Sequence, residues 1–171
     1  LYPSGVEEII RFGLLGIAMS RYSGCWTGFK IVSDVADSGK RYDTAVETSP
    51  IIIPSENFLG EYKDLPRNIL YSDTPRDQDY RLQRAKGFAA QEFVRANNID
   101  KSMWKDRDSK MGIITAGKSY NDVREALRWL KIDEEKAKAL GLCIYKVGMP
   151  WPLEPHGVRD FCEGLDTVLV V

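Results

Sequence analysis

The order of apolar runs in the last third of the chain constrains its fold most. Three short runs rich in β-branched residues lie at 111–116, 142–147 and 167–171. Helical patterns separate them, at 120–130, 133–140 and 155–164. Strands that alternate with helices are typical of a parallel sheet with right-handed crossovers. The sequence therefore predicts an α/β fold: an open parallel sheet with helices on both faces, whose strands are buried on both sides.

A helical and irregular segment is predicted before this sheet. The letters SGVE at 4–7 match a capping box, and apolar residues then recur at helical spacing to about Ser20. Small residues on or near that stripe would let a neighbouring backbone approach closely: Gly13, Gly16 and Ala18. A second helix is predicted over 26–37, and a strand over 25–29 is the alternative.

Extended chain is predicted next. Ala45-Val46 could form a short strand, and a second strand is a candidate at 51–53. Because prolines bracket the second run, it suits an edge strand or an extended link.

One long helix follows over 76–97, starting after Thr74-Pro75. Its predicted inner face is Leu82, Ala85, Ala89, Phe93 and Ala96. Charged residues, Arg81 among them, are interpreted as its solvated outer face. Residues 99–110 are predicted to form a polar link.

The letters GIITAGKS at 112–119 match the phosphate-binding pattern GxxxxGK[ST]. A phosphate loop consists of loop residues, whereas Ile113 and Ile114 are typical of a buried strand. The remaining turn is too short to encircle a triphosphate, and the later strands carry no acidic residue for magnesium. A weaker interpretation stays open: Gly117, Lys118 and Ser119 precede or begin a helix, whose free N–H groups and dipole favour an anion.

Composition excludes several functional classes. The net charge of -1 and the pI of about 6.0 predict no nucleic-acid partner and no anionic membrane partner. Cys25, Cys143 and Cys162 are widely spaced, which predicts unpaired thiols in a reducing compartment, the cytoplasm. With His156 as the single histidine, interpreted as a loop or helix-cap residue, we expect no metal site. The longest apolar stretch near the start is too short to span a membrane.

Both ends of the sequence are typical of a piece cut from a longer chain. It begins at a capping box without an initiator methionine, and it stops in the apolar run at 167–171. Because a buried parallel strand needs a covering helix, we expect an internal segment of a larger polypeptide.

Three stretches resemble the large bacterial indolepyruvate ferredoxin oxidoreductases, in which two subunits are fused. They are SRYSGCWTGFK at 20–30, TAGKSYNDV at 115–123 and YKVGMPWPLEP at 145–155. The resemblance implies an enzyme that decarboxylates aryl-2-oxoacids on thiamine diphosphate with Mg²⁺. It also implies electron transfer through [4Fe-4S] clusters to ferredoxin, acyl-CoA formation from CoA, and a homodimer of the whole enzyme.

The resemblance also implies a division of this chain. Residues 1–40 would be the tail of a pyrimidine-binding domain, 41–109 a linker with the long helix, and 110–171 a truncated domain similar to the transketolase C-terminal domain. The family's activating glutamate, its diphosphate and magnesium motif and its cluster cysteines have no counterpart here. The segment is therefore expected to be inactive alone, without catalytic, cofactor or metal residues.

The expected role of the segment is structural, with the other domains of the same polypeptide as partners. Trp26, Met149 and Trp151 are candidate packing residues at such contacts, and a place in the core is the alternative for each aromatic residue. The competing hypothesis is a small phosphate- or nucleotide-binding α/β module that uses the turn Gly117-Lys118-Ser119.

Overall fold

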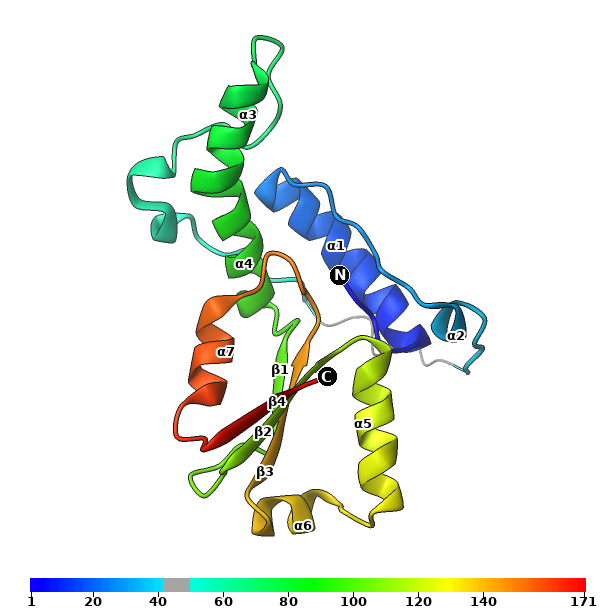
Figure 1. The fold of residues 1–171 in the computed structure, drawn as a ribbon. Helices are drawn as coiled ribbons and strands as arrows, with labels where there is room; N and C mark the ends of the chain where they lie inside the picture. The colour runs from blue at the N-terminus through cyan, green and yellow to red at the C-terminus, as the bar shows by residue number, and fades with distance from the viewer. Residues whose placement is uncertain (42–49) are drawn as a thin grey trace.

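The computed structural model describes residues 1–41 and 50–171, and it shows a pair of packed helices beside a four-stranded sheet (Figure 1). The helical part contains α1 (Val6–Ser23), α2 (Ser33–Ala36), the 3₁₀ segment η2 (Asn57–Tyr62), α3 (Pro75–Arg81), the π-turn η3 (Leu82–Lys86) and α4 (Gly87–Ala96). The sheet part contains β1 (Lys101–Met103), β2 (Met111–Ala116), α5 (Lys118–Trp129), α6 (Glu134–Ala139), β3 (Leu142–Val147), α7 (Pro155–Cys162) and β4 (Thr167–Val170).

The three predicted strands are parallel neighbours, as expected. The sheet order is β1-β3-β2-β4, with Ile113 of β2 level with Ile144 of β3 and with Leu169 of β4. Helices cover both faces: α5 and α6 pack on Ile113 and Ile144, while Phe161 of α7 packs on Tyr145 and its neighbours. The α/β class with helices on both faces is thus confirmed.

The sheet also has a strand that the sequence did not predict. β1 lies within the expected polar link and pairs antiparallel with β3, Lys101 opposite Lys146. A three-residue edge strand with an exposed lysine and serine carries almost no apolar signal, which is why the pattern missed it. The sheet is therefore parallel over three strands and antiparallel at one edge.

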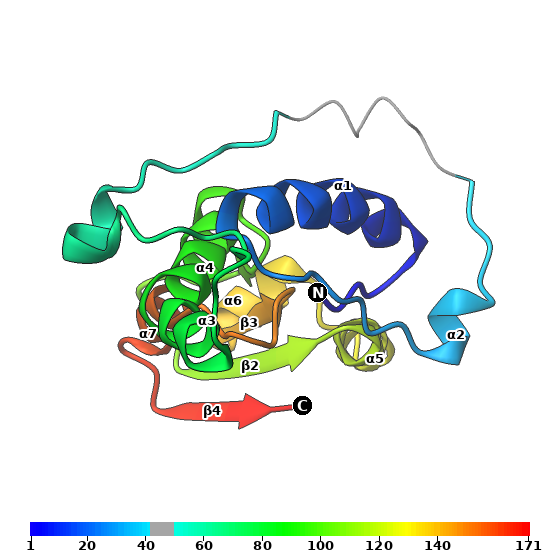
Figure 2. The ribbon, with the colours of Figure 1, turned by 90° about the horizontal axis from the view of Figure 1, so that it is seen from above.

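The last strand is exposed, contrary to the expectation of full burial. All four residues of β4 face solvent to a large extent, and Val170 is 74% exposed. The cause is position: among the strands that the structure describes, β4 pairs with β2 alone and forms the second edge of the sheet (Figure 2).

The helical part has its own core between α1 and α4. Phe12, Leu15, Met19 and Tyr22 of α1 contact the α4 residues Ala89, Ala90, Phe93 and Val94. The two alanines are small and leave room on the α4 surface for the large α1 side chains, so the two helices can pack closely. Met149, from the loop after β3, is part of this core and links it to the sheet.

The first helix was predicted with inexact details. α1 begins after Gly5 and runs to Ser23, beyond the predicted end near Ser20. In place of the predicted Glu7, Glu8 accepts hydrogen bonds from the backbone and the hydroxyl of Ser4. The prediction of a helix over 26–37 is wrong for most of its length: only α2, Ser33–Ala36, is helical, because residues 25–32 run along α1 as extended chain. Thr27 there donates a hydrogen bond to the Gly16 carbonyl at 3.1 Å, a close approach of the kind that the small residues predicted.

The long helix is confirmed, with one interruption. Thr74 and Asp77 form a capping box at its start, and the π-turn η3 then adds a residue to one turn. As a result Leu82 is 43% exposed instead of lying on the inner face. Arg81 is buried against Asp73 instead of solvated.

Residues 51–53 form an extended link rather than a strand. Both backbone groups of Ile52 bond the side chain of Asn97, each at 2.8 Å. The short strand considered at Ala45-Val46 lies outside the described residues. Within residues 1–41 and 50–171, no helix is long and apolar enough to cross a membrane.

Gly112 offers a test of the packing between β2 and α7. A Cβ there would lie 2.6 Å from Leu165 and 2.8 Å from the Phe161 ring. We expect Gly112→Ala to lower the free energy of unfolding by about 1–3 kcal/mol in urea denaturation. Gly13→Ala is the control: apart from its own helix backbone, no atom of the described residues lies within 4 Å of its Cβ position, so it should raise the stability by about 0.5–1 kcal/mol. Equal effects of the two substitutions would contradict this packing.

Candidate functional site at the carboxyl ends of the strands

Open parallel sheets bind ligands outside the carboxyl ends of their strands, and here that edge is occupied by the chain itself. The backbone N–H of Tyr2 donates to the carbonyl of Gly148, just after β3, at 2.8 Å. Asn121 of α5 donates to the carbonyl of Ser4 at 2.6 Å. Residues 1–4, the amino-terminal strap, therefore lie across the ends of β2 and β3.

The turn after β2 does not form a phosphate loop. Residues 112–116 belong to β2, α5 begins at Lys118, and Gly117 with φ 53° is the single residue between them. The Tyr2 ring lies against Gly117, so that a Cβ there would be 2.1 Å from it. The nucleotide-binding alternative is not favoured by this geometry.

The weak anion-site candidates Gly117, Lys118 and Ser119 do come together at the start of α5, and anion binding by them stays a prediction. The sequence pattern predicts Ser119 as the cap of a helix over 120–130, and this prediction is wrong, because the helix begins at Lys118 and Gly117 occupies the N-cap position. Lys118 Nζ lies 2.9 Å from Asp122 and 3.5 Å from Asp34, and the hydrogen bond to Asp122 raises the pKa of Lys118. Two carboxylates of the protein thus already accompany this lysine.

A cleft of about 590 Å³ opens beside the strap, between α1, α2, α5 and the β1–β3 edge. Its charged lining residues balance in sign, four acidic and four basic: Glu7, Glu8, Asp34, Asp122, Lys40, Lys101, Lys118 and Lys146. Lys40 pairs with Glu7 at 2.7 Å, and Lys146 pairs with Glu8. A balanced lining of this kind suits a joint between parts of a protein better than a pocket for a polyanion.

Lys146 is the central group of this site, and sequence analysis overlooked it. It lies in the buried strand β3 and is only 4% exposed. Its Nζ donates to Ser4 Oγ at 2.8 Å, forms an ion pair with Glu8 and lies 4.5 Å from the centre of the Tyr120 ring. The sequence did contain a signal for this site: a lysine lies inside the apolar run of a predicted buried strand. Such a cation needs a buried partner.

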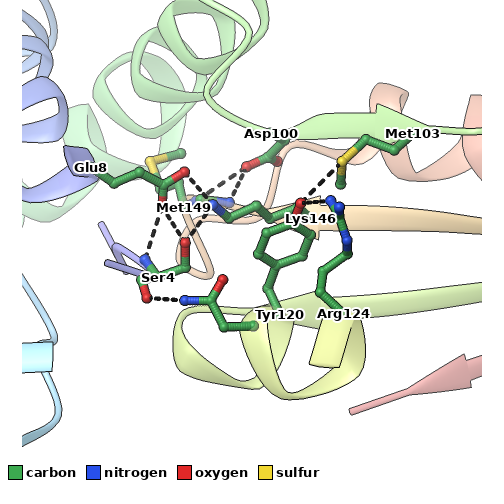
Figure 3. A network of polar contacts seen from close by, with 10 residues as sticks. Ser4, Glu8, Asp100, Met103, Tyr120, Arg124, Lys146 and Met149 are labelled. Atoms are coloured by element: carbon green, nitrogen blue, oxygen red, sulfur yellow. Dashed lines mark hydrogen bonds and ion pairs between the residues drawn. The ribbon is translucent and has the colours of Figure 1, made fainter. Parts of the chain in front are cut away.

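The protonation states of the pair follow from burial and contact. Burial lowers the pKa of Lys146, and the Glu8 carboxylate partly offsets that effect. Burial would raise the pKa of Glu8, but Lys146 and the Ser4 donors outweigh it, so the pKa lies below its ordinary value. The strap, α1 and β3 are therefore joined by one charged network (Figure 3).

A second buried carboxylate holds the loop after β3. Asp100 Oδ1 accepts hydrogen bonds from the backbone N–H groups of Gly148 at 2.7 Å and Met149 at 3.1 Å. Its Oδ2 is buried and lacks a hydrogen-bond partner within the described part of the chain. Burial, with a contribution from Glu154, raises the pKa of Asp100 to about 6.

Other candidate residues occupy different surroundings. Met149 is 2% exposed and is a core residue, whereas Trp26 and Trp151 are 94% and 86% exposed. His156 lies exposed in the first turn of α7, where its backbone N–H donates to Glu154. Across residues 1–41 and 50–171, no group of three His, Cys, Asp or Glu side chains is placed to hold a metal ion.

Comparison with known proteins adds to this geometry. The model of the indolepyruvate oxidoreductase domain family matches residues 101–171, which include all four strands. The resemblance to the indolepyruvate oxidoreductases is confirmed. The matched residues contain the stretches at 115–123 and 145–155, while the stretch at 20–30 lies outside them and its resemblance stays a prediction.

Three curated relatives are indolepyruvate oxidoreductase subunits. Indolepyruvate oxidoreductase subunit IorA from Pyrococcus horikoshii is 46% identical over 65 residues, and those from Pyrococcus abyssi and Thermococcus kodakarensis are 43% identical over 65 residues. The alignments cover 37% of this chain and 9% of each relative. The chain thus spans about a tenth of the length of the relatives that it matches.

One solved structure is also similar. It is the 2-oxoglutarate:ferredoxin oxidoreductase from Magnetococcus marinus with 2-oxoglutarate, coenzyme A and succinyl-CoA bound. The alignment has 22% identity and a TM-score of 0.40, and it covers 60% of this chain and 17% of that chain.

Removing one partner of the buried pair should destabilise the fold strongly. Lys146→Met leaves the Glu8 carboxylate without its cation, and we expect a loss of about 3 kcal/mol in the free energy of unfolding. Lys118→Met is the matched control, because that lysine pairs at the surface, and it should cost at most about 1 kcal/mol. Similar small losses in both variants, measured by urea denaturation, would mean that the ion pair does not hold α1 on the sheet.

Asp100 should make stability fall as the pH rises from about 4 to about 6. Its folded pKa of about 6 exceeds the ordinary 3.8, so the folded state binds more protons in this window and loses stability as they dissociate. Asp100→Asn keeps the Oδ1 acceptor and removes the charge. The stability of this variant minus that of the unaltered protein should therefore be greater at pH 7 than at pH 4, by at most about 3 kcal/mol. Urea midpoints at both pH values measure this, and a pH-independent difference would contradict it.

Proposed function

We propose that this chain is a non-catalytic structural segment of a larger thiamine-dependent 2-oxoacid ferredoxin oxidoreductase, one that converts indolepyruvate-type substrates to acyl-CoA. The family match over residues 101–171 supports the class of enzyme. The observation that carries the structural role is the occupied sheet edge: the strap lies where an open α/β sheet would bind a ligand.

The charged network gives this role its physical basis. Because Lys146 reaches Glu8 and Ser4 from the middle of the sheet, the amino-terminal helix and the sheet are held in a fixed relation. An enzyme with several cofactors needs such rigid joints, since electron and acyl transfer depend on the placement of the domains that hold them.

The remaining properties of the larger enzyme are part of the same proposal. Thiamine diphosphate, Mg²⁺ and [4Fe-4S] clusters would be held by other parts of a homodimeric enzyme, and CoA and ferredoxin would be its acyl and electron acceptors. The domain division at residues 1–40, 41–109 and 110–171 also belongs to this proposal. A cytoplasmic location agrees with the free thiols of Cys25, Cys143 and Cys162.

The full-length oxidoreductase that contains this segment provides the test. Indolepyruvate- and CoA-dependent ferredoxin reduction should proceed with kcat and KM unchanged within about twofold in Lys118→Ala, since no reacting group contacts that lysine in this proposal. Lys146→Met should instead shorten the thermal half-life of the activity without changing KM. A full-length protein without activity on any aryl-2-oxoacid would overturn the enzyme assignment.

Calorimetric titration of the 171-residue chain with ATP–Mg²⁺ distinguishes the alternative. We expect no saturable heat. Micromolar binding that is lost in Lys118→Ala and kept in Lys136→Ala, a control at an exposed lysine of α6, would favour the phosphate-binding module instead.

A further inference from the structure

A groove of about 440 Å³ lies between η2, the helical run of η3 and α4, and the start of α7. In Figure 1, η2 and α7 flank α4 on the same side. The walls of this aromatic groove include Phe58, Tyr62 and Phe88, of which Phe58 and Phe88 are 37% and 53% exposed. Rings of this size are normally buried, so their exposure around one groove is typical of a surface that another protein segment covers.

Arg84 is the cation that this groove leaves without a carboxylate. Arg67, Arg81 and Arg95 each form an ion pair, whereas Arg84 has no ion-pair partner among the described residues. Its guanidinium carbon lies 5.9 Å from the centre of the Tyr62 ring. A guanidinium that stacks on a ring keeps its N–H edge free to bind a carboxylate through two hydrogen bonds. Arg84 also belongs to the π-turn η3, and such turns often lie at functional sites.

The carboxylates that line the groove are already engaged. Glu92 pairs with Arg95, and both oxygens of Glu154 accept backbone N–H groups at the start of α7, at 3.0 and 2.6 Å. A hydrogen bond to Glu61 raises the pKa of Tyr62. Within the described residues, the charge that remains without a partner in the groove is therefore positive.

We propose that the aromatic groove docks a protein segment in which an aromatic side chain stands next to an aspartate or glutamate. The ring of that segment lies between Phe58 and Phe88, and its carboxylate binds Arg84. A peptide fits this surface better than a free small acid, because exposed apolar side chains continue beyond the groove. Leu153 and Trp151, in the loop that leads into it, are 40% and 86% exposed.

Both walls of the groove are fixed before anything docks. Leu59 of η2 is 5% exposed and anchors that segment on the protein. Gln91 Nε2 of α4 donates to the carbonyl of Leu153 at 2.7 Å and so ties α4 to the loop before α7. A pre-formed groove costs little ordering on binding. The proposal is independent of the proposed enzymatic function, because it needs no substrate or cofactor.

An NMR titration of the isotopically labelled 171-residue chain with the peptide acetyl-Ser-Asp-Phe-Ser-amide tests the proposal. We expect amide shifts confined to residues 57–62, 84–95 and 153–157, with a Kd of about 0.1–1 mM, since so short a segment makes few contacts. Exchanging the Asp of the peptide for Asn, or its Phe for Ala, should weaken binding at least about tenfold. An absence of shifts, or shifts at other residues, would overturn the proposal. Benzoate that binds as tightly as the peptide would assign the groove to small aromatic acids and would also overturn it.

Variants of the chain separate the charge from the ring contacts. Arg84→Gln should weaken binding of the Asp peptide at least about tenfold and leave that of the Asn peptide unchanged. Arg76→Gln is the matched control, because Arg76 is exposed in the same helical run and does not line the groove, and it should change neither affinity. Phe88→Ala should weaken both peptides alike, since it removes a ring contact. Circular dichroism checks that each variant stays folded. Equal losses in Arg84→Gln and Arg76→Gln would mean that net charge attracts the peptide, and would refute docking in the groove.

Discussion

A lysine in the middle of a buried strand sets the organisation of this protein. Lys146 cannot lie in β3 without a countercharge, because an unpaired ammonium group in the interior is too costly. Glu8 supplies that charge from a helix 138 positions earlier in the chain. The first helix and the sheet are consequently joined by a buried ion pair, although their apolar cores are separate clusters.

The same contact decides what the sheet edge can do. By drawing Ser4 and Glu8 toward β3, it lays the strap over the strand ends, where Tyr2 fills the space beside Gly117. A ligand at this edge would have to displace the strap and break the ion pair. The α/β topology is thus retained while its usual binding position serves to join two parts of the chain.

Sequence reasoning succeeded where a single local cause fixes the structure. β2 and β3 were predicted to the residue, because buried β-branched runs end at glycines and caps. It failed where distant segments decide. The apolar spacing at 26–37 reflects packing of extended chain along α1, and β1 exists only because β3 offers it an edge. The site at Lys146 was hidden for the same reason, since its partners lie more than 130 residues away.

Exposed apolar residues are distributed in a way that agrees with a joining role. Trp26, Trp151 and the residues of β4 lie on different elements, and each is too exposed to add much to the internal cores. Large exposed aromatic and branched side chains are typical of surfaces that other protein segments cover. Most charges of the cleft, by contrast, form ion pairs with one another. A protein that neutralises its concave site and exposes apolar side chains elsewhere is suited to bind protein surfaces rather than small anions.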